Sequence, residues 1–245
     1  MKYYDLNIRG NSYESDLRLI LEANRLGWTY VNLIFSPEEY PLALKYKEEL
    51  GEKLDYIEKV ANLKNKPCFE FAIEINEGNP NDIRKTSRKF RNKTKFISVL
   101  GGDSKINRSA CENIQVDLLS RPYYRRRDCG INHILAKEAY ENNVAIELCF
   151  KDILTSYLSY RAKILSHFRD IIKLHQKFKF PLVITTGSSS ILDIRSPRDI
   201  SATFTSLGLN EDEINSCLNS YPEKIISFNN DRKKMPVLGV KEIDK

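Results

Sequence analysis

The residues whose types could do chemistry are most concentrated in SRPYYRRRDCGINH, which covers residues 120–133. This stretch holds four arginines, two tyrosines and one of the three histidines of the chain. Guanidinium groups bind phosphate oxygens through paired hydrogen bonds, and tyrosine rings stack on unpaired bases. A histidine is also a candidate general acid or base. The stretch is therefore a catalytic site, a binding site for an anionic partner, or a solvated loop.

The distribution of charge along the chain favours an anionic partner. Residues 81–137 carry 14 Lys and Arg against 5 Asp and Glu, a net charge of +9. The whole chain has a net charge of +6, so the remaining residues sum to −3. A basic segment on a near-neutral background is typical of proteins that bind phosphate-rich partners, although a solvated charged surface gives the same pattern. Arg84, Arg88, Arg91 and Lys95 are at helical spacing and predict a basic stripe.

A second candidate pattern, Asp5-Leu6-Asn7-Ile8-Arg9, lies at the end of the first predicted strand. Its spacing is similar to the Asp-x-His-x-His opening of metal-dependent phosphoesterases that are built on a seven-stranded barrel. Two histidines at this spacing on a strand face the same way and can share a metal ion. Here Asn7 and Arg9 fill both histidine positions, and amide and guanidinium groups are poor metal ligands. The pattern therefore disfavours a metal-dependent hydrolase.

Three further candidates carry weaker signals. Lys151 follows a predicted strand and could form a Schiff base, but Asp152 beside it would raise its pKa, which is the wrong direction for a nucleophile. Residues 186–190, TGSSS, offer amides and hydroxyls to a phosphate, and a plain turn explains them equally well. His167 and His175 are eight residues apart in a helical pattern, which predicts helix-surface residues rather than metal ligands.

The elements that would position these residues alternate between short apolar runs and segments of helical length. The predicted strands are residues 3–8, 30–35, 68–75, 95–100, 114–119, 144–150 and 182–186. Runs rich in Val, Ile, Leu and Phe are typical of parallel strands covered on both faces. Seven strand–helix units without a linker predict a single α/β domain over residues 1–230. We expect a TIM-barrel-like barrel of about seven parallel strands with surrounding helices.

The alternative to the barrel is a doubly wound open sheet, and residues 231–245 are predicted to form a loosely held tail. In either fold, residues 120–133 follow the carboxyl end of the fifth predicted strand, where functional groups gather. Asn132 and His133 then fall in the first turn of the next helix, where amide groups favour an anion. Lys137 lies one turn further along that helix.

The cysteines and the apolar runs indicate the compartment. No two of the five cysteines are closer than 18 residues, so no zinc-ribbon pair is present, and Cys68 and Cys149 lie in apolar runs and are predicted to be buried. No apolar run approaches the roughly 18 residues that suggest a membrane span. We therefore expect a reducing, cytoplasmic location and no membrane partner.

Two blocks of the sequence resemble ribonuclease P protein component 3. The first block runs from Arg121-Pro122 through RDCG at 127–130 and NHILAK at 132–137 to ENNVAIE at 141–147. The second is LVITTG at 182–187, followed by DIRSPRD at 193–199. The order of elements is similar over nearly the whole chain. One departure is Ser188, because that family more often has a small residue such as Ala after the glycine.

The resemblance implies a PHP-like barrel, related to the phosphoesterases but without their metal ligands. It also implies a subunit of the ribonucleoprotein that removes the 5′ leader of precursor tRNA, in which the RNA subunit carries the catalysis with Mg ions. The chain would then be an enzyme only as part of the holoenzyme, would bind no cofactor itself, and would have no catalytic residue. The implied partners are the ribonuclease P RNA, protein component 2, the other ribonuclease P proteins, and precursor tRNA through the complex.

The candidate contacts with RNA or with a protein partner are mostly cationic, and the sequence does not separate one kind of contact from the other. They are Arg9, Arg84, Arg88, Arg121, Arg125, Arg126, Arg127, Asn132, His133, Lys137, Arg195, Arg198 and Asp199. Asp199 could orient Arg195 or could belong to a helix start. Two other functions stay open: a free-standing metal-dependent phosphoesterase, and a scaffold whose basic face binds an acidic protein rather than RNA.

Overall fold

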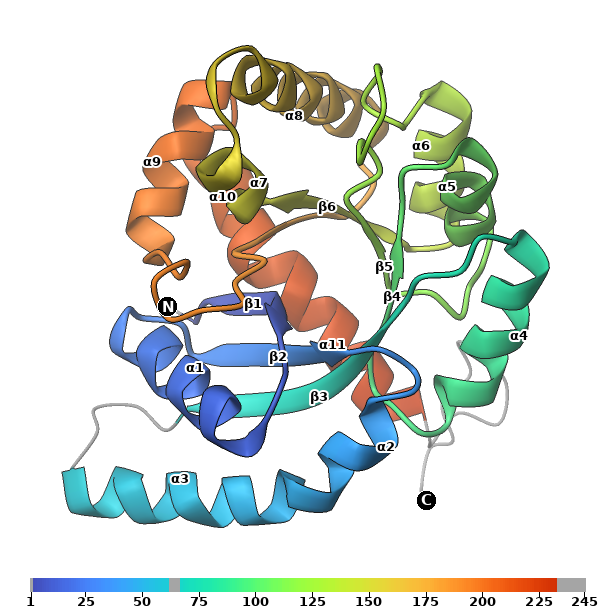
Figure 1. Ribbon diagram of the computed structural model, residues 1–245. Coiled ribbons are helices and arrows are strands. Elements are labelled where there is room, and N and C mark those ends of the chain that lie inside the picture. The colour runs from blue at the N-terminus through green and yellow to red at the C-terminus, as the bar shows by residue number, and fades with distance from the viewer. Residues whose placement is uncertain (1, 62–66, 233–245) are drawn as a thin grey trace, which may run out of the picture.

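Seven parallel strands form a nearly closed barrel in this computed structural model, which describes residues 2–61 and 67–232 (Figure 1). Each strand pairs with the next one in sequence, so the order runs from β1 to β7 without a reversal. The first and last strands are in contact, and the amide of Arg9 donates to the carbonyl of Ser188 over 2.7 Å. This order excludes the doubly wound sheet, whose strand order reverses near its centre.

The strands lie where the apolar runs predict them, so the barrel of seven strands is confirmed. They are β1 Tyr4–Arg9, β2 Tyr30–Phe35, β3 Cys68–Ile75, β4 Ile97–Leu100, β5 Leu118–Ser120, β6 Ala145–Cys149 and β7 Leu182–Thr185. The largest difference is at β5, which begins at Leu118 because Ile114 and Gln115 form a turn and Ile114 is exposed.

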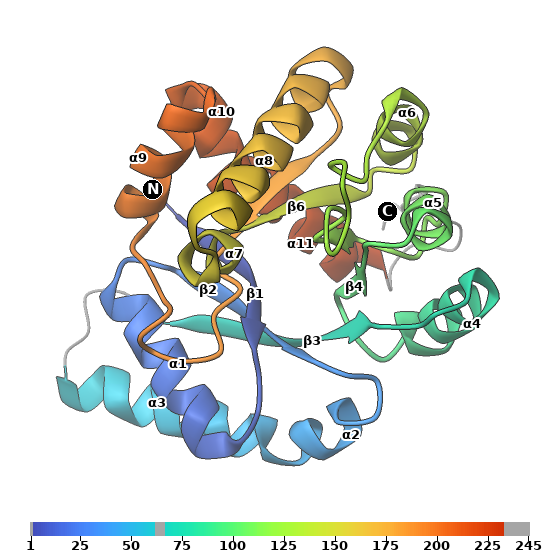
Figure 2. The same cartoon turned by 45° about the horizontal axis from the view of Figure 1, so that its top comes forward.

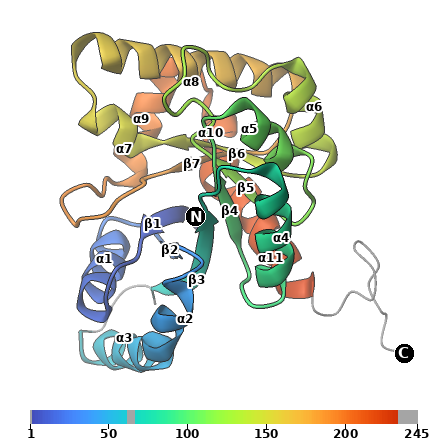
Figure 3. The ribbon, with the colours of Figure 1, turned by 45° about the vertical axis from the view of Figure 1, so that its right-hand side comes forward.

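Helices surround the barrel, with α8 and α3 on opposite sides of it (Figures 1 and 3). They are α1 Tyr13–Arg25, α2 Tyr40–Ala43, α3 Lys47–Ala61, α4 Pro80–Arg91, α5 Ser104–Cys111, α6 His133–Glu141, α7 Phe150–Thr155, α8 Leu158–Phe178, α9 Pro197–Leu207, α10 Glu211–Asn215 and α11 Tyr221–Asp231. A short 3-10 helix covers Leu44–Tyr46, and a π-helical turn at Ser216–Ser220 joins α10 to α11. None of the helices in the described parts of the chain has the length and apolar character needed to cross a bilayer.

The amino end of the barrel is closed by α11. Its Glu223 accepts a hydrogen bond from the Tyr4 hydroxyl over 3.1 Å, and its Asn229 donates to Asp117, just before β5, over 2.9 Å. The cluster that fills this part of the barrel is Tyr4, Leu6, Ile34, Ala72, Phe96, Leu118, Ala145, Val183 and Ile225. Because α11 closes one end, the loops at the carboxyl ends of the strands form the other face of the barrel.

Two predictions from the helical patterns are wrong. His167 and His175 are both buried, because α8 turns them inward with Phe168 and Ile171 rather than toward solvent. The ring of His175 lies 2.7 Å from the Phe180 carbonyl through Nδ1, so it fixes the chain just after the end of α8.

The predictions for the cysteines divide. Cys149 is buried as predicted. The prediction for Cys68 is wrong, because its side chain is exposed at the first position of β3.

At the end of the chain, α11 extends to Asp231, and Arg232 donates to Gln115 and to the Ile114 carbonyl. The rest of the predicted tail, residues 233–245, lies outside the described residues.

Candidate functional site

The cationic stretch forms the loop between β5 and α6, residues 121–132, which we call the β5–α6 loop. Its path needs unusual backbone angles, since φ is +45° at Arg121, +56° at Arg125 and +75° at Gly130. A Cβ atom at Gly130 would lie 2.0 Å from the Pro122 carbonyl oxygen, so only glycine fits where the loop folds back on itself. Left-handed backbone at two arginines costs roughly 1–2 kcal/mol per residue, so other contacts must stabilise this conformation.

Two side chains from neighbouring elements fix the base of this loop. Asn107 of α5 donates to the carbonyls of Pro122 and Gly130, over 2.9 Å each. Asp152 of α7 accepts a hydrogen bond from the Tyr123 hydroxyl over 2.8 Å. It also accepts from Arg121 over a longer distance of 3.5 Å. The loop is therefore anchored on both sides before it reaches solvent.

The two tyrosines of the loop have different environments. Tyr123 is buried, and its hydroxyl also accepts from the Cys149 amide, so its ring is not available to stack on a base. This contradicts our expectation for Tyr123. The half-buried ring of Tyr124 contacts two guanidiniums, and its centre is 4.9 Å from that of Arg121 and 5.1 Å from that of Arg125. Tyr124 therefore holds two positive charges together through cation–π contacts.

The three consecutive arginines border three different surface hollows. Arg125 lines a hollow of about 390 Å³ beside Gly102, and Arg126 lines one of about 490 Å³ between α5 and α6. Arg127 lines a third hollow of about 580 Å³ against α8, together with two lysines, Lys163 and Lys173, and two acids, Asp128 and Asp170. The β5–α6 loop therefore presents its arginines to several adjacent depressions at the carboxyl-end face of the barrel.

These arginines differ in how their charge is balanced. Arg126 donates to both carboxylate oxygens of Asp128 over 2.6 and 2.9 Å, and to the Gly102 carbonyl over 2.9 Å. Among the described residues, neither Arg125 nor Arg127 has a carboxylate partner, and both are exposed. Arg125 and Arg127 are therefore the guanidiniums of this loop that are most available to an anion.

The start of α6 holds three predicted residues close to this loop. Asn132 is the N-cap, and its Oδ1 accepts from the amides of Ile134 and Leu135 over 3.0 Å each. His133 and Lys137 are both exposed. The sequence alone missed Lys105 and Arg108 of α5, which line the same hollow as Arg126. The Gly101-Gly102 turn before α5 was the available signal, since it follows the carboxyl end of β4.

The predicted basic stripe on α4 is wrong in part. Arg84 and Arg88 are exposed, with Arg84 3.7 Å from Glu112, but Arg91 is buried at the end of the helix. Arg91 is 2.7 Å from Asp117 and also donates to the carbonyls of Gln115, Thr94 and Lys95. It turns inward because α4 ends there and leaves carbonyl groups that its guanidinium can bind.

The residues after β7 have mainly local partners. Arg195 donates to the carbonyls of Leu192 and Ile194 over 2.7 and 2.9 Å. Asp199 belongs to the start of α9, where its amide donates to the Ser196 hydroxyl and its carboxylate accepts from the same hydroxyl. It therefore does not orient Arg195, and Arg198 is exposed one residue earlier. Figure 2 shows α9 and α4 on opposite sides of the barrel, so the predicted residues do not form one patch.

Lys151, the candidate Schiff-base lysine, lies in the first turn of α7, directly after β6, and contacts the loop that follows β7. Its Nζ is 2.9 Å from Asp193 Oδ2 and 2.5 Å from the Ser189 hydroxyl. Within residues 186–190, Gly187 adopts φ of +64°, and a Cβ atom there would lie 2.3 Å from the Cys149 sulfur. The loop is therefore packed closely against the end of β6, and Lys151 is engaged in holding it.

The mouth of the barrel shows what replaces the histidines of the phosphoesterase pattern. Asn7 donates to the buried Glu147 over 2.6 Å, and the hydroxyls of Ser120 and Thr185 do the same. Arg9 binds Glu74 through two contacts of 2.7 and 2.8 Å. The protein's own amide, hydroxyl and guanidinium groups therefore satisfy these carboxylates, and Arg9 is committed to a partly buried ion pair.

Two ionisable groups at this mouth respond to burial. Burial raises the pKa of Asp5 to about 7, although the Thr186 hydroxyl and the amides of Asn7 and Thr186 donate to it. Burial opposes the charge of Arg121, but nearby groups, with Cys149 and Asp152 foremost, raise the pKa of Arg121 overall. In the described parts of the chain, no three His, Cys, Asp or Glu side chains converge as a metal site.

The chain is similar over its whole length to proteins of one family. The sequence model of the family RNase P subunit p30 matches residues 2–234. Ribonuclease P protein component 3 of Methanothermobacter thermautotrophicus is 42% identical, over 98% of this chain and 95% of that protein. The protein of the same name from Methanococcoides burtonii is 37% identical, over 69% of this chain and 70% of its own length.

Solved structures show the same relationship. A chain of an archaeal ribonuclease P solved with mature tRNA has a TM-score of 0.79 and 30% identity, and the match covers 99% of this chain and 98% of that one. A probable 2-pyrone-4,6-dicarboxylic acid hydrolase from Acinetobacter baumannii has a TM-score of 0.56 at 10% identity, over 93% of this chain and 100% of the hydrolase. The hydrolase shares the fold alone. The two family blocks, the barrel and the whole-length matches agree that this chain belongs to the RNase P subunit p30 family.

Proposed function

We propose that this chain is a protein subunit of the ribonuclease P that removes the 5′ leader of precursor tRNA. In this role it binds and organises the ribonuclease P RNA together with protein component 2, in the cytoplasm. The RNA carries the catalysis with Mg ions, and this chain supplies neither a cofactor nor a catalytic residue. The enzyme activity then belongs to the holoenzyme and not to the isolated chain.

The observation that carries this proposal is the anchored β5–α6 loop, with its exposed arginines on the carboxyl-end face. A loop fixed at its base by Asn107 and Asp152 holds Arg125 and Arg127 in set positions. Because their charge has no carboxylate partner among the described residues, a phosphate gains their full attraction without first displacing an acid. Lys105 and Arg108 add positive charge to the neighbouring hollow beside Arg126, and Lys137 is exposed on α6.

The contacts at the barrel mouth argue against the alternative of a metal-dependent phosphoesterase. Arg9 places a guanidinium on Glu74, next to the carboxylate Glu147 that Asn7 already satisfies. A cation that belongs to the protein repels a metal ion from these carboxylates. The other alternative is a scaffold whose basic face binds an acidic protein rather than RNA. Binding of the ribonuclease P RNA, with an affinity that falls steeply as salt rises, would favour our proposal over this scaffold.

Reconstitution of precursor-tRNA cleavage tests the proposal. The ribonuclease P RNA and the other protein subunits are combined with and without this chain, and the rate of 5′-leader removal is measured at limiting Mg. We expect cleavage to slow when this chain is omitted, and also when R125Q and R127Q are introduced together. The matched control is R25Q, because Arg25 is an exposed arginine of α1 whose ion-pair partner is its neighbour Glu22. Unchanged cleavage without this chain would contradict the proposal.

A further inference from the structure

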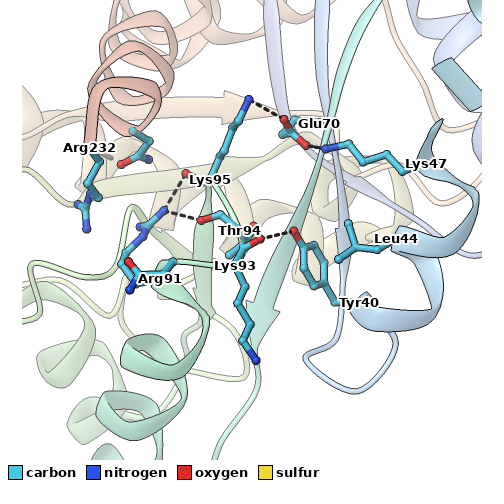
Figure 4. Close-up of a pocket in the computed structure, with 11 residues that line it drawn as sticks. Tyr40, Leu44, Lys47, Glu70, Arg91, Lys93, Thr94, Lys95 and Arg232 are labelled. Atoms are coloured by element: carbon cyan, nitrogen blue, oxygen red, sulfur yellow. Dashed lines mark hydrogen bonds and ion pairs between the residues drawn. The ribbon is translucent and has the colours of Figure 1, made fainter. Parts of the chain in front are cut away.

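A second basic site lies at the end of the barrel opposite to the β5–α6 loop. It is a cavity of about 240 Å³ that opens beside the start of β3, the segment before β4 and the end of α11 (Figure 4). Its lining residues are Tyr40, Leu44, Lys47, Glu70, Arg91, Asn92, Lys93, Thr94, Lys95, Asn229 and Arg232. A water molecule takes roughly 30 Å³, so the cavity has room for a small polyatomic ion with waters.

Positive charge exceeds negative charge among these lining residues. Five of them are Lys or Arg, and Glu70 is the one carboxylate that they include. Glu70 binds Lys47 and lies 3.0 Å from Lys95, so one acid is shared between two lysines. Asp117, which lies behind the cavity, balances Arg91.

Arg232 lies at the edge of the cavity with neutral partners only among the described residues. Its guanidinium donates to Gln115 Oε1 over 3.1 Å and to the Ile114 carbonyl over 3.3 Å, and it lies 5.3 Å from the centre of the Phe228 ring. A half-buried guanidinium without a directly paired anion is unfavourable, because water is removed from the charge and only the more distant Asp117 compensates it.

Three buried polar atoms of the lining side chains have no hydrogen-bond partner. They are Nε of Arg91, Nε of Arg232 and Oδ1 of Asn229. The side chains of Arg91 and Asn229 are more than nine-tenths buried, at 8% and 6% exposure. Buried polar groups in native proteins are almost always hydrogen-bonded, so these atoms leave the polar balance of the lining incomplete.

Two acid–base shifts agree with an excess of positive charge. Burial lowers the pKa of Lys47 to about 8, and the neighbouring Lys95 lowers it further. Burial also lowers the pKa of Arg232, and Arg91 lowers it further, whereas Asp117 partly opposes both effects. A bound anion would oppose both shifts, since it favours the charged forms of these groups.

We propose that this cavity binds a phosphate group between Lys95 and Arg232, beside the buried Arg91. The dominant charge is cationic, the donors are of the types that bind phosphate oxygens, and the volume suits an ion of this size. Two sources share this chemistry: a phosphate of an RNA backbone, and a free phosphate or small phosphate ester. That RNA supplies the phosphate rests on the proposed function, whereas the site itself does not.

Binding of inorganic phosphate to the full chain tests the site. Isothermal titration at low ionic strength is compared for the wild type, R232Q and K95Q, with R25Q as the matched surface control and chloride as the control ion. Loss of one charge-assisted hydrogen bond corresponds to roughly tenfold or more in affinity. We expect saturable phosphate binding that R232Q and K95Q each weaken about tenfold, with R25Q unchanged and all four proteins folded by circular dichroism. Absence of saturable binding, or equal binding by all four, would overturn the proposal.

Lysine acylation read by mass spectrometry identifies the source. If the RNA backbone fills the cavity, both inorganic phosphate and the ribonuclease P RNA will protect Lys95 from acylation. If a free phosphate fills it, only inorganic phosphate will protect Lys95. The variant with R125Q and R127Q keeps this cavity intact and should bind phosphate as the wild type does. A failed phosphate site and a failed RNA-binding role of the β5–α6 loop are therefore distinguishable.

Discussion

The salt dependence of RNA binding should differ between the arginines of the β5–α6 loop that have a carboxylate partner and those that do not. Each contact between a cationic side chain and a phosphate of single-stranded or duplex nucleic acid contributes about 0.7–0.9 to the slope of log affinity against log salt. Arg126 already donates twice to Asp128, whereas Arg125 and Arg127 have no carboxylate partner among the described residues. We therefore expect R125Q and R127Q each to lower the slope by about 0.7–0.9, and R126Q to lower it much less.

The expected loss of affinity follows from the same contacts. A hydrogen bond to a charged group contributes about 1.5–3 kcal/mol, which is roughly a tenfold to hundredfold change in affinity. R125Q and R127Q should therefore weaken binding to the ribonuclease P RNA by that factor at low salt. R126Q should weaken it less, because Asp128 cancels much of the charge that Arg126 presents.

Fluorescence anisotropy of labelled ribonuclease P RNA over a series of potassium chloride concentrations, at constant Mg, measures both quantities. R25Q serves as the control for the loss of a surface guanidinium outside the loop, and melting temperatures confirm that the variants are folded. Equal slopes for R126Q and R127Q would refute the reasoning, because the Asp128 ion pair would then make no difference. Wild-type slopes for both R125Q and R127Q would show that phosphate contacts do not form at this loop.

Three other predictions concern the fold around the site. The pKa of Asp5 is raised from 3.8 to about 7 by burial, so between these pH values the folded state holds a proton that the unfolded chain has lost, and stability falls as pH rises. At about 1.4 kcal/mol per pKa unit, the free energy of unfolding falls by at most roughly 4 kcal/mol over this range. Urea denaturation at several pH values should show that D5N lacks most of this fall. An identical pH dependence in D5N would show that Asp5 is not its cause. G130A should lower stability by about 1–3 kcal/mol and weaken RNA binding, because its Cβ atom would clash with the Pro122 carbonyl at a left-handed φ. Wild-type melting temperature and wild-type RNA affinity in G130A would be inconsistent with this geometry. R9Q should lower stability by about 1–3 kcal/mol, since it leaves the buried Glu74 without the guanidinium of Arg9. The slope of log RNA affinity against log salt should stay unchanged. A lower slope without a loss of stability would instead make Arg9 an RNA contact.

The fold could be predicted because its signals are local. Strands buried on both faces need continuous apolar runs, and β2 and β3 match their runs residue for residue. The place of the β5–α6 loop also followed from the sequence, since any loop after the fifth parallel strand emerges at the carboxyl-end face. Gly130 marked the point where that loop turns into α6.

The charge state of the individual site residues could not be predicted, because their partners are distant in the sequence. Arg91 is 26 residues from Asp117, Tyr123 is 29 residues from Asp152, and Arg9 is 65 residues from Glu74. A basic stripe or an aromatic pair is visible in the sequence, but its burial depends on which acids the barrel brings beside it. In the sequence, Arg91 therefore looked like Arg88, and Tyr123 looked like Tyr124. In the structure Arg91 and Tyr123 are buried, whereas Arg88 is exposed and Tyr124 is half-buried.

The barrel mouth explains why the surface arginines are free to bind a partner. Carboxylates inside a barrel need compensating positive charge or donors, and here Arg9 balances Glu74 while three neutral donors satisfy Glu147. Arg121 adds a second guanidinium, which Asp152 and the Tyr124 ring hold beside the mouth. These interior charges have their partners within the fold, so they form no ion pairs with the arginines further along the loop. Arg125 and Arg127 consequently project from a rigid base with their charge uncompensated, as a phosphate-binding surface requires.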